Sequence, residues 1–414
     1  MSIKLRLTIL NFLQFFVFGT WLLSFGKYMG ATLHFTGTEI GAVFMTLGIA
    51  SLFMPGIMGI ISDRWTGPNK LYAVSHIIGA GFLYLIAQQT DFNSLYLFTL
   101  LYLMLYMPTI GLDNTISYLI MEKHKMDVVK EFPPIRVWGT IGFIIAVWTT
   151  DLFGWGININ QFYFAGISSL VLGIYTFTLP DYPLEKNTAK KTLVQALGLD
   201  AFVLFKDKKM AVFFIFSMLL GAALQVTNMW GEAFLHDFTA SFKDAFIVKN
   251  NGIIMSISQI SETVFILTIP FFLKRYGIKK VMLMSMFAWF LRFALFGIGS
   301  PVGIGAGFLI LSMIVYGMAF DFFNISGSLF VELEAKPKIR ASAQGLFIIM
   351  TNGLGAIIGA YGSGYIIDLF TKEGTKDWTS IWFIFAAYAL VIGILFALLF
   401  KYKHNPEKIK DIKH

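Results

Sequence analysis

The chain contains no cysteine among its 414 residues. Disulfide bonds, cysteine-ligated metal sites and thiol chemistry are therefore excluded. Charged residues are also scarce, at 14% of the chain, against about 25% in ordinary soluble proteins. So low a charge content excludes a disordered chain and a nucleic-acid partner, and it argues against most soluble enzymes.

Apolar residues, by contrast, make up 57% of the chain, and the mean hydropathy is +0.71. Aromatic residues reach 17%, with 44 phenylalanines, as expected of a protein whose outer surface faces lipid. Two runs without a charge, 40–62 and 381–400, are 23 and 20 residues long. A membrane-spanning helix needs roughly 20 residues, so both runs predict spans.

Similar runs recur along the chain and predict twelve membrane-spanning helices. Their expected starts lie near residues 7, 40, 71, 95, 135, 161, 211, 251, 281, 303, 341 and 381. The longest connection divides the spans six and six. We therefore expect an all-α polytopic membrane protein with an N-terminal six-helix bundle (1–180), a cytoplasmic loop (181–210), and a C-terminal six-helix bundle with a cytoplasmic tail (211–414). Apolar residues at helical spacing between Leu193 and Leu204 indicate an amphipathic helix in the loop, with a solvated linker as the alternative.

The distribution of basic residues predicts the orientation of the spans. With the N-terminus inside, 26 of the 32 lysines and arginines fall on the same side of the membrane. Cytoplasmic loops carry an excess of these residues. Both termini are therefore expected in the cytoplasm, which agrees with an even number of spans.

The two halves of the chain also resemble each other. Gly59-Ile-Ile-Ser-Asp63-Arg64-Trp-Thr-Gly67 follows the second span, and Lys274-Arg275-Tyr-Gly277-Ile-Lys-Lys280 follows the eighth. Arg64 and Arg275 stand 211 residues apart, close to half the chain. Two parallel six-span halves with a basic glycine turn after span two of each resemble the major facilitator superfamily, in which substrate binds at the midplane between the halves. An ordinary positive-inside loop is the alternative explanation of this turn.

Ionisable side chains inside a membrane are costly and usually mark function. Six fall within the expected spans: Asp113, Arg136, Glu232, Glu262, Arg292 and Asp321. Helical spacing groups some of them with other polar or aromatic residues on shared faces: Arg136, Thr140 and Phe143; Gln225 and Asn228; Gln259 and Glu262; Tyr316 and Phe320, with Asp321 one step round. This mixture of amide, carboxylate and aromatic groups suits a neutral, flat, hydrogen-bonding ligand.

Each group also has a structural alternative. Gln225 and Asn228 could only tie helices together, and Phe143 and Phe320 could be packing residues. Arg292 could neutralise one of the carboxylates. Glu262 and Asp321 are harder to explain structurally, because a lone buried carboxylate is costly. The roles of Asp113, Glu232 and Arg292 stay open.

Several longer motifs carry a more specific resemblance. The stretch Phe132-Pro-Pro-Ile-Arg136-Val-Trp-Gly-Thr140-Ile-Gly-Phe143 resembles the fifth-span signature of the bacterial nucleoside:proton symporters, of the nucleoside-permease type. Further matches lie at 197–202, 255–262, 269–278, 316–327 and 339–345, within a similarity that runs from Ile9 to about His404.

The resemblance implies proton-coupled nucleoside uptake by alternating access across the bacterial inner membrane. It implies a nucleoside site lined by Arg136, Thr140, Phe143, Gln225, Asn228, Gln259, Glu262, Tyr316, Phe320 and Asp321, with Asp321 and Glu262 as the proton-coupling acids. Purine and pyrimidine nucleosides and protons are the expected substrates and the lipid bilayer the surroundings, with no cofactor or metal and with a monomer as the default. A sibling branch prefers xanthosine, so the base preference stays open.

Three other classes of function fit the sequence less well. A major-facilitator carrier for another small polar solute would have polar clusters with few carboxylates, whereas Glu262 and Asp321 favour proton coupling. A membrane-embedded enzyme would need a catalytic constellation, and the sequence contains neither a His-Glu-x-x-His motif nor paired histidine ligands. A receptor without transport does not explain the duplicated halves. We therefore expect a transporter rather than an enzyme.

Overall fold

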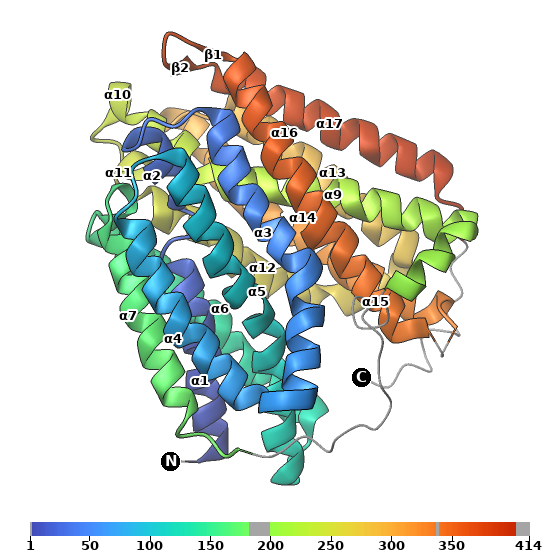
Figure 1. The fold of residues 1–414 in the computed structure, drawn as a ribbon. Coiled ribbons are helices and arrows are strands. Elements are labelled where there is room, and N and C mark those ends of the chain that lie inside the picture. The colour runs from blue at the N-terminus through green and yellow to red at the C-terminus, as the bar shows by residue number, and fades with distance from the viewer. Residues whose placement is uncertain (1, 182–198, 337–338, 403–414) are drawn as a thin grey trace. The chain divides into compact units, whose positions relative to one another are not determined.

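The computed structural model describes residues 2–181, 199–336 and 339–402 (Figure 1). The chain divides into two compact units. The first comprises residues 1–35 and 42–197, and the second comprises residues 36–41 and 198–414. The amphipathic helix expected in the loop falls partly outside the described residues, since its first half precedes residue 199. The described remainder forms the short 3-10 helix η3 (Leu199–Lys206).

The first unit is built from helices joined by short turns. In chain order they are α1 (Ile3–Gly19), α2 (Phe25–Ala31), α3 (Gly37–Ile61, whose first residues group with the second unit), η1 (Ser62–Thr66), α4 (Pro68–Ala87), α5 (Phe92–Lys123), α6 (Val128–Leu152), η2 (Trp155–Ile157) and α7 (Asn160–Thr176).

The second unit continues with the same kind of structure. After η3 come α9 (Lys208–Asp237), α10 (Thr239–Phe242), α11 (Phe246–Lys249), α12 (Asn251–Tyr276), α13 (Ile278–Ile298), α14 (Gly303–Glu334), α15 (Arg340–Ile348), the π-helix η5 (Ile349–Gly355), α16 (Ala356–Leu369) and α17 (Trp378–Leu399). A hairpin of two-residue strands, β1 (Thr371–Lys372) and β2 (Thr375–Lys376), pairs Thr371 with Lys376 between α16 and α17.

Each of the twelve expected spans falls on one of these helices, the eleventh on the run from α15 through η5 to α16. Within the described residues, ten helices are long and apolar enough to cross a membrane, and α1 and α7 have 17 residues each. Helix α6, which corresponds to the fifth expected span, begins at Val128, about two turns before the expected start near residue 135. Its N-terminus is capped by Asp127, which accepts a hydrogen bond from the Lys130 N–H at 3.2 Å.

The same helix pairings recur in both units. The first long helix packs on the fifth (α1 on α6; α9 on η5 and α16), and the third packs on the fourth and sixth (α4 on α5 and α7; α13 on α14 and α17). In Figure 1, α4 and α7 can be followed side by side. Two turns repeat as well, since Gly67 and Gly277, which precede α4 and α13, have positive φ values of 73° and 78°. The similarity expected between the halves therefore extends to backbone conformation.

Glycines allow the first and fifth helices of each unit to touch through their backbones. A Cβ atom at Gly142 of α6 would overlap the Phe12 carbonyl group of α1. In the second unit, a Cβ at Gly355 would lie 2.5 Å from the Met218 carbonyl oxygen, and one at Gly359 would overlap the Ala222 backbone. The spacing Gly355-x-x-x-Gly359 is typical of close helix packing, and the structure contains such a contact. We call the contact of Gly355 and Gly359 with α9 the glycine seam.

Candidate substrate site

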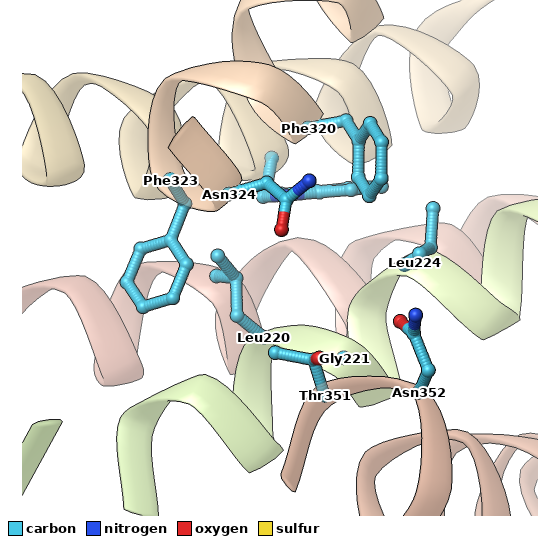
Figure 2. A pocket seen from close by; sticks show the side chains of 9 residues that line it. Leu220, Gly221, Leu224, Phe320, Phe323, Asn324, Thr351 and Asn352 are labelled. Carbon is cyan, nitrogen blue, oxygen red and sulfur yellow. The ribbon is translucent and has the colours of Figure 1, made fainter. Parts of the chain in front are cut away.

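A pocket opens within the second unit between α9, α14 and η5 (Figure 2). The empty space in and in front of it, which includes open solvent, amounts to ≈ 310 Å³. Its lining combines apolar, aromatic and amide groups: Leu220, Gly221, Leu224, Trp289, Phe320, Phe323, Asn324, Thr351 and Asn352. Pockets for small organic ligands have this composition, with a few placed polar groups among apolar ones.

The π-helical turn η5 places two of the polar lining residues. Thr351 and Asn352 belong to η5, where the backbone departs from the regular α-helical pattern, as often happens at functional sites. Gly221 of α9 has no side chain, and a Cβ there would overlap the Thr351 carbonyl group. This absence lets η5 approach α9 and brings the Asn352 amide to the pocket, where Figure 2 shows it below Asn324.

Helix α14 contributes the aromatic face of the pocket. Phe320 lines it directly, and its ring stacks on Tyr316 with centroids 6.3 Å apart and an interplanar angle of 12°. Asn324 lies one turn beyond Phe320. A flat ring and an amide on one helix face can bind the face and the edge of a heterocycle.

The two predicted coupling acids lie on helices in direct contact. A Cβ at Gly317 of α14 would meet the Ser261 and Glu262 backbone of α12 at 2.6–2.7 Å, and the Ser261 hydroxyl donates to the Ile314 carbonyl oxygen. The carboxyl groups of Asp321 and Glu262 act on each other and on Tyr316 electrostatically. Asp321 is buried, and its Oδ2 has no hydrogen-bond partner among the described residues.

The amides predicted on α9 and α12 differ in exposure. Asn228 is half-buried and continues the helix face of Leu220 and Leu224, which line the pocket. Gln225 is buried, and its Nε2 has no partner in the described part of the chain; the same holds for Oε1 of Gln259. Unsatisfied buried amide atoms cost free energy, so these groups are suited to pairing with a ligand.

The remaining predicted residues, Arg136, Thr140 and Phe143, lie on α6 in the first unit. Arg136 is half-buried, and its guanidinium group stands 4.0 Å from the centre of the Phe15 ring of α1. Phe143 is 9% exposed and makes an edge contact with Phe18 at 6.4 Å. Phe320 is the member of the ten predicted site residues that lines the pocket in Figure 2.

Arg292, a possible counter-ion by sequence, forms hydrogen bonds to neutral groups. It is fully buried, and its hydrogen bonds go to neutral groups: the Thr227 hydroxyl (3.2 Å), the Ser258 hydroxyl (3.3 Å) and the Ser312 carbonyl oxygen (2.9 Å). Its guanidinium group also lies 4.6 Å from the Tyr316 ring centre. Arg292 therefore joins α9, α12, α13 and α14 behind Tyr316. Glu232, five residues before the end of α9, is buried at 3% exposure.

Sequence reasoning missed Asn324, Thr351, Asn352 and Trp289 as lining residues. Asn324 had a signal, since it follows Asp321 by one turn on the same helix. Asn352 stands in a glycine-rich span and could have been found as a lone amide in apolar surroundings. No helical pattern predicts the π-helical turn that turns Asn352 toward the pocket.

The fold and the pocket define a class of protein: a polytopic α-helical membrane carrier with the major facilitator fold. The crystal structure of nucleoside transporter NupG superimposes with a TM-score of 0.92 and 54% identity, covering 97% of this chain and 100% of that chain. The expected fold class is confirmed.

Sequence comparisons give the family. The profile of the nucleoside H+ symporter family matches residues 1–405. The chain is 54% identical over 406 residues to the nucleoside permease NupG of Escherichia coli, covering 98% of this chain and 97% of the permease. It is 52% identical over 412 residues to the xanthosine permease of Escherichia coli, covering 99% of each. The chain belongs to the nucleoside H+ symporter family. It is a multi-pass membrane transporter, not an enzyme, and it takes up nucleosides together with protons.

Proposed function

We propose that the protein carries purine and pyrimidine nucleosides with protons into the cell across the bacterial inner membrane, as a monomer in the lipid bilayer. One observation carries the proposal: Asp321, a buried carboxyl group without a partner at Oδ2, stands beside Phe320 of the aromatic and amide pocket. When a proton-binding group lies next to a group that contacts the substrate, proton binding and substrate binding can be coupled.

The recognition roles follow from the chemistry of the side chains. Phe143 and Phe320 stack on the base, while Gln225, Asn228 and Gln259 pair with ribose hydroxyls or base edges. Asn324 and Asn352 join them from the pocket. Asp321 and Glu262 carry the proton, because they are the carboxyl groups on the contacting helices α14 and α12, and Asp321 neighbours Phe320 of the pocket. Arg136, Thr140 and Tyr316 complete the site.

Uptake assays test this function. Radiolabelled uridine and adenosine are offered to cells that lack their own nucleoside permeases, with and without an uncoupler. We expect accumulation of both nucleosides above the external concentration and loss of that accumulation with the uncoupler. Uptake that ignores the uncoupler would reject proton coupling, and failure to transport either nucleoside would reject the substrate class.

Xanthosine is a second candidate substrate, favoured by the 52% identity to the xanthosine permease over 99% of both chains. Competition distinguishes the two. Unlabelled xanthosine that inhibits uridine uptake as strongly as uridine itself would place xanthosine among the principal substrates, and weak inhibition would leave it a minor one.

The orientation of the chain gives a topological prediction. Because most basic residues lie on one side of the spans, tags at residue 1, within 180–210 and at residue 414 should report the cytoplasm. A tag within 237–250 should report the outside. Alkaline phosphatase and fluorescent protein fusions measure this directly, and an external C-terminus would contradict both the orientation and the twelve-span count.

The stacking role of Phe143 gives a binding prediction. Base stacking on an aromatic ring contributes about 1–3 kcal/mol, and each 1.4 kcal/mol is about tenfold in affinity. Phe143→Ala should therefore weaken uridine binding roughly tenfold or more, measured as the half-saturating concentration for uptake. Phe177→Ala is the matched control, since that ring is 59% exposed and lies in the first unit. Equal affinities in the two variants would move the site away from Phe143.

A further inference from the structure

A buried polar stripe runs along α5 where it faces α1. Its members, Thr109, Asp113 and Ser117, recur every four residues and are all 0% exposed. Residues at this spacing lie one above another on a helix. Asp113 is therefore flanked on both sides by hydroxyl groups that point to the same neighbouring helix.

The two outer members are tied to α1, and the middle one is not. The Gln14 amide donates to the Thr109 hydroxyl at 2.9 Å, and the Asn11 amide donates to the Ser117 hydroxyl at 3.3 Å. Neither oxygen of Asp113 has a hydrogen-bond partner in the described residues. An ionised carboxylate in such a place is strongly disfavoured. The Asn11 Oδ1, on the amide that reaches Ser117, is likewise without a hydrogen-bond partner among the described residues.

The ionisable groups around Asp113 come from three helices. Tyr106 and Tyr118 lie on α5 itself, Tyr72 and His76 lie on α4, and Arg136 lies on α6. The groups that α1 contributes here are the neutral amides of Asn11 and Gln14. His76 is engaged at both ring nitrogens, 3.0 Å from the Ser169 hydroxyl and 3.0 Å from Gln14 Oε1, and the Tyr72 hydroxyl donates to the same Oε1 at 2.6 Å. Among these neighbours, Arg136 is the cation that acts electrostatically on Asp113.

Arg136 lies at the α1–α6 contact. Its guanidinium group stacks on Phe15 at 4.0 Å, and a Cβ at Gly139, one turn along α6, would lie 3.3 Å from the Asn11 carbonyl oxygen. Asn11 in turn donates to Ser117, which lies one turn from Asp113 on α5. Arg136 is half-buried, and it acts electrostatically on Asp113.

We propose that Asp113 is a second proton-binding site of the carrier, in the first unit, and that its charge positions Arg136 toward or away from the nucleoside. The proposal rests on the assignment of Arg136 to the nucleoside site. An ionised Asp113 attracts the guanidinium group toward α5. A proton from water neutralises the carboxylate and releases Arg136 to the substrate. Asp113 is a positioning residue, which acts on the substrate through Arg136.

The proposal sets the sign of a pH effect. Nucleoside affinity rises as pH falls through the titration of Asp113, because the neutral form releases Arg136. Couplings between two binding events typically amount to about 5–150-fold in affinity. Asp113→Asn fixes the neutral form. We therefore expect its half-saturating uridine concentration to be low, to vary less between acid and alkaline pH than that of the unaltered protein, and at alkaline pH to lie about fivefold or more below it.

Ser117→Ala is the matched control, because it removes a hydrogen-bonding neighbour from the same stripe and leaves the ionisable group. It should keep the pH dependence of the unaltered protein. If the half-saturating uridine concentration of Asp113→Asn varies with pH as it does in the unaltered protein, the proposal is overturned. That result is expected of an acid that is always protonated and only structural, because asparagine can replace it. A changed maximal rate with an unchanged pH dependence of affinity would also overturn it.

A second measurement covers the case in which Asp113→Asn does not fold. In purified protein carrying Asp321→Asn and Glu262→Gln, an infrared difference spectrum after a pH jump should still show a buried carboxyl group that titrates. Its absence would overturn the proposal. This readout needs no transport, so it separates the proposal from the proposed function: lack of uridine uptake by the unaltered protein rejects the function, whereas lack of this titration rejects only the role of Asp113.

Discussion

Cells that carry Asp321→Asn should take up uridine without concentrating it, and the uptake rate at saturating uridine should no longer depend on external pH. Nucleosides are neutral, so accumulation requires an outside energy source. One charge that crosses a potential of about 100 mV supplies about 2.3 kcal/mol, which supports a gradient of roughly 50-fold. Removing the acid that carries the proton should lower the steady-state ratio from that level to about one.

Three features make Asp321 the leading candidate for the acid that carries the proton. It is buried, its Oδ2 has no partner in the described residues, and it neighbours Phe320 of the pocket. Glu262 is half-buried on the contacting helix, so Glu262→Gln should weaken substrate binding as well as coupling. Protonation of Asp321 removes the charge that opposes Glu262, and each acid therefore influences the other.

Asp244→Asn is the control for this experiment, because it makes the same change at an acid whose side chain is 78% exposed. It should accumulate uridine as the unaltered protein does. Uncoupler-sensitive accumulation by Asp321→Asn would show that the proton travels by another residue, and Glu262 would then be the leading candidate.

A single methyl group at the glycine seam should destabilise the protein strongly. At Gly359, the Cβ of alanine would overlap the Ala222 backbone of α9. Backbone atoms cannot move aside as side chains do, and overpacking typically costs about 1–3 kcal/mol and occasionally more. We expect Gly359→Ala to lower the thermal stability of the purified protein, measured as the temperature at which the monodisperse fraction is lost.

The same helix offers the matched control. A Cβ at Gly362 would meet no atom within 4 Å. Alanine favours the helix over glycine by roughly 0.5–1 kcal/mol, so Gly362→Ala should leave stability unchanged or raise it slightly. Equal loss of stability in both variants would indicate that helix–helix contact is not what Gly359 provides.

Most of the fold could be predicted from the sequence, because the length of an apolar run alone limits what it can form in a membrane. The twelve spans, the repeated glycine turns at Gly67 and Gly277 and the close packing at Gly355 and Gly359 all follow from such local patterns. The start of α6 could not be predicted from hydropathy, because its first turns carry the charged residues Lys130 and Glu131 and contain Pro133 and Pro134. The N-terminal cap at Asp127 decides that boundary.

The site was less accessible to sequence reasoning. Spacing could place Tyr316 and Phe320 on one face, and the structure stacks them. Spacing could not show that Arg292 binds neutral groups, because its partners Thr227, Ser258 and Ser312 lie on three other helices. Nor could it show that Thr351 and Asn352 line the pocket, since their placement depends on the π-helical turn and on the missing side chain of Gly221.

The glycine seam has a mechanical consequence. Side chains between two helices absorb a displacement by changing rotamer, whereas backbones in contact have no such slack. Helix α9, the π-helical turn η5 and the start of α16 are therefore expected to move together as one rigid unit. In the proposed site, a nucleoside that displaces Thr351 and Asn352 would then displace α9 as well. The same movement would extend along α16, whose 14 residues span about 21 Å at 1.5 Å per residue.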